Sequence, residues 1–184
     1  QISGIDSDTF EKTTTAIKTR GFWLGTNLIT ALIAASVINI FKDTLEQVIF
    51  LAVLMPIIAS MGGVAATQTL TITVRGLALG QIVKANYLYL FNRELIVGIS
   101  NGFLWAVILS LIACTWFQDW LLAWVICLSM IINLTAGVLS GMGIPILLRS
   151  LKLDPAVAGS VIVTTVTEVI GFFSFLGLAS YFYS

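Results

Sequence analysis

Residues 154–182 read DPAVAGSVIVTTVTEVIGFFSFLGLASYF, an apolar run with a single carboxylate in its interior, Glu168. A transmembrane helix needs about 20 mostly apolar residues, so this stretch is long enough to cross a bilayer. At a rise of about 1.5 Å per residue, Glu168 lies roughly 20 Å from Pro155 in a hydrocarbon core about 30 Å thick. A carboxylate at that depth is costly, and by default it marks a water-filled path, an ion or a partner. We therefore expect the function of the chain to centre on Glu168.

The composition of the whole chain predicts an integral membrane protein. Hydrophobic residues make up 58% of the 184 positions and charged residues only 10%. Several further apolar runs are long enough to span a bilayer, so we expect an all-α fold with five transmembrane helices. The predicted spans are residues 22–41, 44–75, 94–117, 120–148 and 154–182. Residues 1–20 are polar and are expected to form a cytoplasmic connecting segment, followed by the membrane domain at 21–184.

The charges and cysteines exclude several classes of function. Nine basic and nine acidic residues cancel, and no dense basic run suggests a surface for nucleic acid. The chain has no histidine, and Cys114 and Cys127 fall in different apolar runs, which argues against structural zinc, copper or haem. An ion handled by this protein should therefore be a hard, oxygen-binding one. An intramembrane enzyme is the least favoured class, because no serine or cysteine stands beside a visible base.

The basic residues predict how the chain is oriented in the membrane. All but Lys42 fall on one side of the predicted spans. These residues are Lys12, Lys18, Arg20, Arg75, Lys84, Arg93, Arg149 and Lys152. The positive-inside bias places the N-terminus in the cytoplasm and, after five spans, the C-terminus outside the plasma (inner) membrane.

The second span contains features that predict an interrupted helix. It is longer than a bilayer requires, and it contains Pro56 and the Gly62–Gly63 pair. Such breaks are tolerated where the freed carbonyl groups line a cavity or are covered by protein. Carbonyl groups at Gly62 and Gly63 could then face an ion or its water shell. Paired glycines also allow helices to approach closely, which is the alternative explanation.

A polar stripe on the fifth span leads to the glutamate. Ser160, Thr164 and Glu168 recur every four residues with Thr167 beside them, so they share one helix face. Small hydroxyl residues also serve where membrane helices pack closely, but packing does not need a charge. We therefore favour ion or substrate contact at this face. On the fourth span, Asn133 either lines the same path or bonds to a neighbouring helix.

The charge of Glu168 favours a homodimer. One carboxylate carries a single negative charge, whereas a divalent cation carries two. Two copies packed about a twofold axis would bring both Glu168 side chains to one pore on that axis. Because Mg²⁺ gives up its water reluctantly, the paired acids would contact a hydrated ion.

Two groups of residues resemble signatures of the MgtE family of magnesium transporters. The resemblance runs from about Gly21 to the end of the chain, in order and with matching spacing. The residues that carry it are Met55-Pro56-Ile57-Ile58, Met61-Gly62-Gly63, Thr67-Gln68 and Arg75-Gly76-Leu77-Ala78, then Asp154-Pro155-Ala156 and Thr164-Thr165-Val166-Thr167-Glu168-Val169-Ile170-Gly171-Phe172.

The resemblance implies a homodimer of five-helix subunits that conducts Mg²⁺ into the cell. Its pore would be lined by the second and fifth helices, with Glu168 binding the hydrated ion. Family members usually carry cytoplasmic magnesium-sensing domains ahead of the membrane part. The chain begins with Gln1 and shows no signal peptide, so we expect it to be part of a longer protein without that sensing domain.

The chain departs from the family pattern in two places. Where the family typically has Gly-Gly-Asn-Ala-Gly, the chain has Gly62-Gly63-Val64-Ala65-Ala66 and so loses an amide and a glycine, and Glu168 stands where the family has an aspartate. Ion selectivity is therefore left open among magnesium, calcium, manganese, cobalt and sodium. Two other functions also stay open: a proton- or ion-coupled carrier or exporter, and a membrane assembly subunit in which Glu168 pairs with a partner helix.

Overall fold

The computed structural model describes residues 13–183, and all of its regular elements are helices. Five of these helices are long and apolar enough to cross a membrane, which confirms the predicted all-α membrane class. The helices are α1 (Thr13–Ile40), α2 (Lys42–Gln47), α3 (Phe50–Ala78), the short 3-10 helix η2 (Lys84–Asn86), α4 (Tyr87–Phe117), α5 (Trp120–Ser150) and α6 (Val157–Tyr183).

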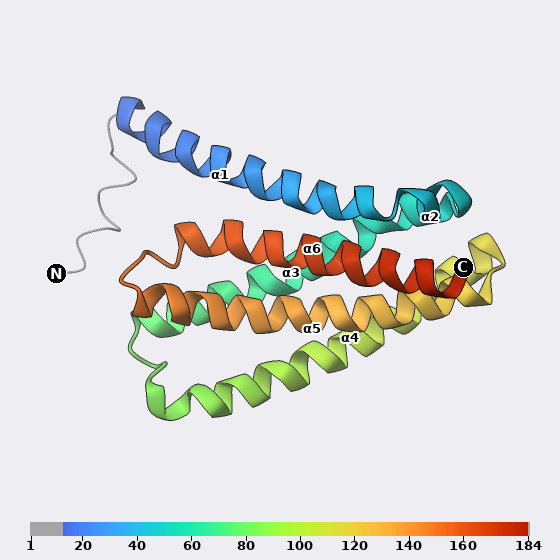
Figure 1. Ribbon diagram of the computed structural model, residues 1–184. Helices are drawn as coiled ribbons and strands as arrows, with labels where there is room; N and C mark the ends of the chain where they lie inside the picture. The colour runs from blue at the N-terminus through green and yellow to red at the C-terminus, as the bar shows by residue number, and fades with distance from the viewer. Residues whose placement is uncertain (1–12, 184) are drawn as a thin grey trace.

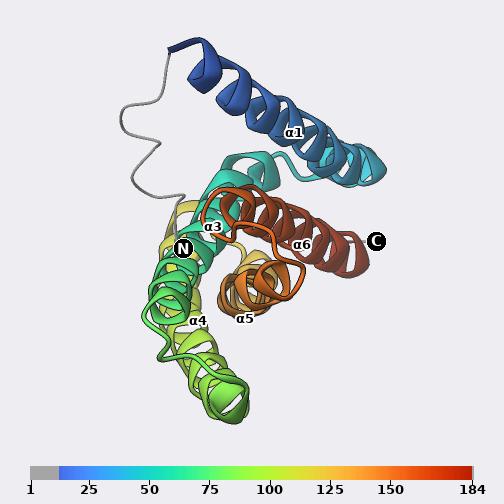
Figure 2. The ribbon, with the colours of Figure 1, turned by 90° about the vertical axis from the view of Figure 1, so that its left-hand side faces the viewer.

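Helix α5 occupies the centre of the bundle. It packs extensively on α3, α4 and α6 (Figure 1). Helix α1 instead rests mainly on α6 and diverges from the other helices towards its N-terminus (Figure 2). Ala34 is the only buried residue of α1 within the described range. The hydrophobic core therefore lies among α3, α4, α5 and α6, and α1 lies at the edge of the bundle.

The predicted helix boundaries need two changes. Helix α1 begins at Thr13, so residues 13–20 continue the first helix and are not separate from it. Residues 1–12, the rest of the predicted connecting segment, lie outside the described range. Helix α4 begins at Tyr87 and not at Glu94, so Glu94 lies about two turns inside the third spanning helix.

The interruption expected in the second spanning helix is absent at the positions named for it. Helix α3 is continuous from Phe50 to Ala78, through Pro56 and Gly62–Gly63. A proline removes one backbone hydrogen bond but does not force the helix to end. The glycines keep their helical conformation and are used for close packing, as the contacts at Gly62 show below. The break in this part of the chain falls at residues 48–49, between α2 and α3.

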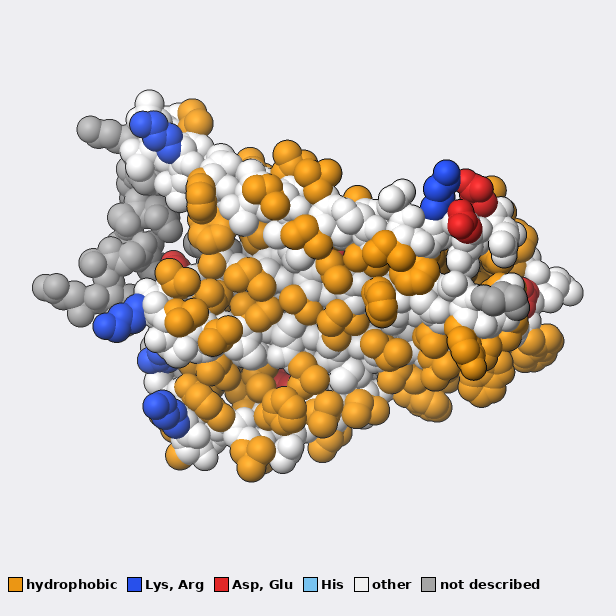
Figure 3. Space-filling model, viewed as in Figure 1, with side chains coloured by type: hydrophobic (Ala, Val, Ile, Leu, Met, Phe, Trp, Pro, Cys, Tyr) orange, Lys and Arg blue, Asp and Glu red, His pale blue; other side chains and the backbone are white. Residues whose placement is uncertain are grey.

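Charged side chains gather mostly at the two ends of the bundle, and hydrophobic side chains cover its flanks (Figure 3). The end where α1 begins carries mainly Lys and Arg, whereas the other end carries acidic side chains next to a basic one. At that second end Asp119 caps α5, because its carboxylate accepts hydrogen bonds from the Leu121 and Leu122 amides. The Tyr183 hydroxyl donates to the same carboxylate and ties the end of α6 to this turn.

Candidate functional site

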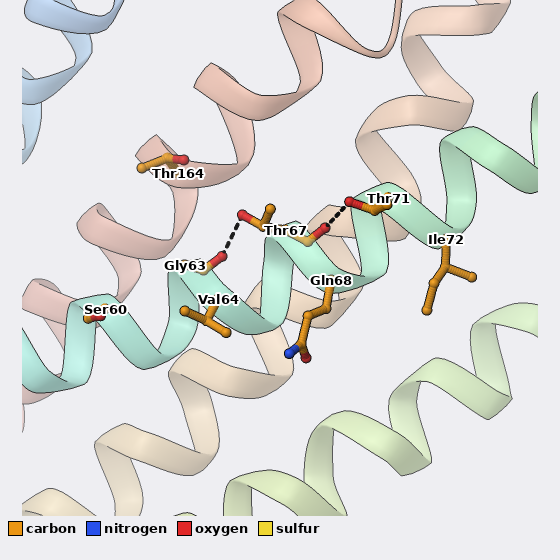
Figure 4. A pocket seen from close by; sticks show the side chains of 8 residues that line it. All are labelled: Ser60, Gly63, Val64, Thr67, Gln68, Thr71, Ile72 and Thr164. Carbon is orange, nitrogen blue, oxygen red and sulfur yellow. Dashed lines mark hydrogen bonds between the residues drawn. The ribbon is translucent and has the colours of Figure 1, made fainter.

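One face of α3 carries a polar stripe that borders an open cleft. Ser60, Gly63, Thr67 and Thr71 follow one another at helical spacing, so they share this face. The cleft has a volume of about 720 Å³, and Thr164 of α6 forms its other wall (Figure 4). The hydroxyl groups of Thr67 and Thr71 each donate a 2.8 Å hydrogen bond to a carbonyl one turn earlier in α3. Their oxygen atoms therefore stay on the cleft side without breaking the helix.

A second cleft contains Glu168. It has a volume of about 580 Å³ and lies among α1, α2, α3 and α6. Ser60, Gly63 and Thr164 line both clefts, so the two form one continuous surface between α3 and α6, mainly apolar but with a row of polar side chains along it. Glu168 is half-buried, and within residues 13–183 no hydrogen bond or ion pair engages its carboxylate. We name this combined surface the α3–α6 cleft.

The other predicted residues of α6 lie differently with respect to the α3–α6 cleft. Thr167 lines its Glu168 end but is fully buried, and its hydroxyl donates to the carbonyls of Val163 and Thr164. Ser160 is exposed one turn before Thr164, and its carbonyl accepts the Thr164 hydroxyl. Of these residues of α6, Thr164, Thr167 and Glu168 line the α3–α6 cleft, whereas Ser160 is not part of its lining. Whether any of these side chains contacts a metal stays a prediction.

Asn133 lies behind the α3–α6 cleft and not in its wall. Its side chain is fully buried, and Nδ2 donates a 2.8 Å hydrogen bond to the Ile58 carbonyl of α3. The amide lies between Gly62 of α3 and Gly171 of α6, where a Cβ atom on either glycine would collide with it. Asn133 Oδ1 has no hydrogen-bond partner in the described part of the chain. The sequence left two roles open for Asn133: lining the ion path or bonding to a neighbouring helix. The structure shows the bond to a neighbouring helix, α3.

Glycines of α5 bring its backbone against the buried face of α3. A Cβ at Gly137 would lie 2.6 Å from the Gly62 carbonyl oxygen, and a Cβ at Gly141 would collide with the Ala66 carbonyl. Small residues at such positions allow membrane helices to approach closely. Helix α5 therefore fixes the back of α3, while the front of α3 presents its polar stripe to the cleft. Gly62 belongs to this packed back face, whereas Gly63 lines the cleft.

Sequence reasoning missed one buried carboxylate, Glu94 of α4. Its relative exposure is 4%, lower than that of the half-buried Glu168. The Thr69 hydroxyl donates to Glu94 Oε2 at 3.4 Å, and Arg93 Nη1 lies 3.5 Å from Oε1. The signal that could have found it is the run Tyr87-Leu88-Tyr89-Leu90-Phe91 directly before Asn92-Arg93-Glu94. This run extends the apolar helix upstream of the charge, but the sequence analysis started the span at the charge itself.

The α3–α6 cleft offers hydroxyl oxygens and the carboxylate of Glu168. Such ligands suit hard cations such as Mg²⁺ and Ca²⁺. The chain supplies one carboxylate to the cleft, and no group of three or more His, Cys, Asp or Glu side chains that could hold a metal ion occurs among residues 13–183. Among these residues the chain therefore offers no closed coordination cage.

These features define a multi-pass helical membrane protein with a cleft in its spanning region that carries hydroxyl groups and one carboxylate. Residues 55–178 match the family model of MgtE, described as a divalent cation transporter. The chain belongs to the MgtE family, and the resemblance drawn from its sequence motifs is confirmed.

Curated relatives support this assignment. The chain is 34% identical over 160 residues to the magnesium transporter MgtE of Bacillus subtilis, covering 87% of the chain and 36% of that protein. The Enterococcus faecalis relative, also a magnesium transporter MgtE, is 29% identical over 98% of the chain and 40% of its own length. The relative of the same name from Thermus thermophilus is 29% identical over 85% of the chain and 35% of its own length. The chain thus matches 35% to 40% of the length of these relatives.

Proposed function

We propose that this chain forms a membrane pore domain that carries divalent cations, with Mg²⁺ as the main substrate, along the α3–α6 cleft. The observation that carries the proposal is Glu168, a carboxylate without a protein partner among the described residues, in a cleft that also carries serine and threonine hydroxyl groups. Leaving such a group unpaired at membrane depth is costly unless water or an ion reaches it. The family match and the relatives named as magnesium transporters support the same choice of ion.

A homodimer would complete this cleft. Ser60, Thr67, Gln68 and Thr71 are exposed in the single chain, although they belong to a membrane-spanning helix. Polar side chains within a membrane almost always face the bundle interior or a water-filled cavity, not lipid. A second copy related by a twofold axis would cover this face, enclose the pore and bring two Glu168 carboxylates to one ion. The hydrated ion would then meet two negative charges, which match a divalent cation.

We further propose the orientation and setting of this domain. The basic end of the bundle, where α1 begins, would face the cytoplasm, and the C-terminus would lie outside the plasma membrane. The cytoplasmic sensing domain usual in the family would belong to a longer protein, since the chain matches only part of each relative. Val64 is exposed on the wall of the cleft, so an apolar side chain replaces the amide there. Selectivity would then depend more on Glu168 and on the threonine hydroxyls.

Flux in liposomes tests the proposal. We would reconstitute the protein, impose gradients of Mg²⁺, Ca²⁺ or Mn²⁺, and compare the wild type with Glu168→Ala and Glu168→Asp. We expect Glu168→Ala to abolish divalent flux or its selectivity and Glu168→Asp to retain flux with an altered order of ions. Glu46→Ala is the matched control, because Glu46 is an exposed carboxylate paired only with Lys42 at the end of the bundle.

The alternative functions predict different results in the same assay. A channel gives currents whose reversal potential depends on the divalent cation alone, whereas a proton-coupled carrier gives one that shifts with the pH gradient. An assembly subunit gives no flux that depends on Glu168, and its alanine variant loses a protein partner instead. Wild-type flux and ion preference in the Glu168→Ala protein would reject the proposal.

A further inference from the structure

Glu94 is a second carboxylate inside a membrane-spanning helix, and the proposed ion path does not use it. Its side chain is almost entirely covered by protein, with a relative exposure of 4%. It lines neither part of the α3–α6 cleft. Since an ionisable group in this environment is expensive, its retention calls for a physical role.

Glu94 makes the side-chain hydrogen bond that joins α4 to α3. The donor is the Thr69 hydroxyl, 3.4 Å from Glu94 Oε2, and both side chains are 4% exposed. Direct packing between α3 and α4 is sparse, because α4 packs mainly on α5. Next to this bond a cavity of about 450 Å³ lies between α3 and α4, with Gln68 and Asn101 on opposite walls. The two helices also touch at their other ends, where the rings of Phe50 and Phe117 lie 4.6 Å apart. The Thr69–Glu94 link therefore joins α3 to α4 on the Glu94 side of this cavity.

Thr69 points away from the polar stripe of α3. At 100° per residue, Thr69 is about 200° around the helix from Thr67 and from Thr71, which line the α3–α6 cleft. The same threonine also touches α5, because a Cβ at Gly141 would lie 3.0 Å from Thr69 Cβ. Any rotation of α3 that moves its polar stripe must therefore also move Thr69 against both α4 and α5.

The contact between Thr69 and Glu94 adds a directional restraint on such a rotation to the close packing of α3 on α5. The hydrogen bond is directional, and removing Thr69 from it would leave a buried carboxylate with Arg93 alone, at 3.5 Å. Leaving a buried charge with too few partners is among the more costly changes inside a protein.

We propose that Glu94 is a positioning residue that, in addition to the packing of α5, restrains the rotation of α3 through Thr69 and so helps to keep the polar stripe of α3 at the α3–α6 cleft. Its consequence for ion flux rests on the proposed function, but its effect on the orientation of α3 does not. The two ideas can therefore be tested and can fail separately.

Thiol labelling of α3 measures its rotation directly. The starting protein is the full chain with Cys114→Ala and Cys127→Ala, which removes both thiols. A single Thr71→Cys substitution then reports the cleft side of α3, and a water-soluble methanethiosulfonate reagent measures its accessibility. The assay contains no divalent cation gradient, so the outcome of the Glu168 experiment does not affect it.

We expect Glu94→Leu and Thr69→Val each to change the labelling rate at Thr71→Cys several-fold. Glu94→Gln and Thr69→Ser should give smaller changes, because they keep the acceptor oxygen and the hydroxyl donor. Combining Glu94→Leu with Thr69→Val should add nothing to either single effect, since both remove the same bond. The control is Thr165→Val, because the Thr165 hydroxyl bonds only within α6, to the Val161 carbonyl.

Size-exclusion chromatography of each variant identifies folded protein. If Glu94→Leu does not fold, the isosteric Thr69→Val carries the test. Wild-type labelling in the folded Thr69→Val protein would overturn the proposal. Equal shifts in Thr69→Val and Thr165→Val would also overturn it, since they would indicate a general loosening of the bundle.

Discussion

The two faces of α3 differ: one is buried against α5 and holds the fold together, and the other is exposed and lines the proposed ion path. On the back face, Gly62, Ala66 and Thr69 are buried against α5 and its glycines. On the front face, Thr67 and Thr71 present hydroxyl groups to the α3–α6 cleft and stay exposed. The back face is complete within one chain, whereas the front face is polar in a region where lipid would select apolar residues. Substitutions on the back should therefore damage the fold, and substitutions on the front should alter flux or assembly.

The largest effect should come from filling the contact between α5 and α3. We expect Gly137→Val to destabilise the protein by about 3 kcal/mol or more, because its Cβ would meet backbone that cannot move aside. Gly143→Val is the control: it lies on the same helix, and a Cβ added there would meet nothing within 4 Å. Unfolding in detergent with increasing denaturant measures both. Equal stability of the two valine variants would contradict the close packing of α5 on the back face of α3.

A smaller loss of stability is expected where Asn133 of α5 contacts α3 and α6, and a second substitution, Asn133→Ala, should partly remove it. Gly171→Ala places a Cβ 2.8 Å from Asn133 Nδ2, so the amide must shift and weaken its bond to the Ile58 carbonyl. We expect a loss of about 1–3 kcal/mol, the range for disturbing a buried polar group. In the Asn133→Ala background the same substitution should cost clearly less, because the atom it meets is gone. Additive losses across this double-mutant cycle would show that Gly171 and Asn133 act independently.

The smallest effect on stability is expected on the front face. Thr67→Val keeps the shape of an exposed side chain and removes only a hydrogen bond within α3, to the Gly63 carbonyl. Its free energy of unfolding should stay within about 0.5 kcal/mol of the wild type. Under the proposed function, the same variant should still change the rate of Mg²⁺ flux in liposomes. A stability loss as large as that of Gly137→Val would remove the distinction between the two faces.

Parts of the site followed from local sequence pattern. The spacing of Ser160, Thr164 and Glu168 placed them on one face of the last helix, since the helical period is fixed by the backbone. The continuity of α3 did not follow from the pattern, because a Gly–Gly pair is compatible with a break and with close packing alike. The folded structure shows that close packing is the explanation for Gly62, because Asn133 and the backbone of α5 lie directly against it. Glu94 was missed because the span was started at its charge, and its bond to Thr69, 25 residues away in the chain, is visible only in the folded protein.

The sequence by itself determined the membrane class, the five spanning helices and the family, because long apolar runs and short motifs are local properties of the chain. The tertiary structure decided which side of each helix is used. It placed Asn133 behind the α3–α6 cleft, Glu168 within it and Glu94 against α3. These placements depend on how close α5 can come to α3 and α6, and that distance is set by glycines from separate helices that meet only in the folded protein.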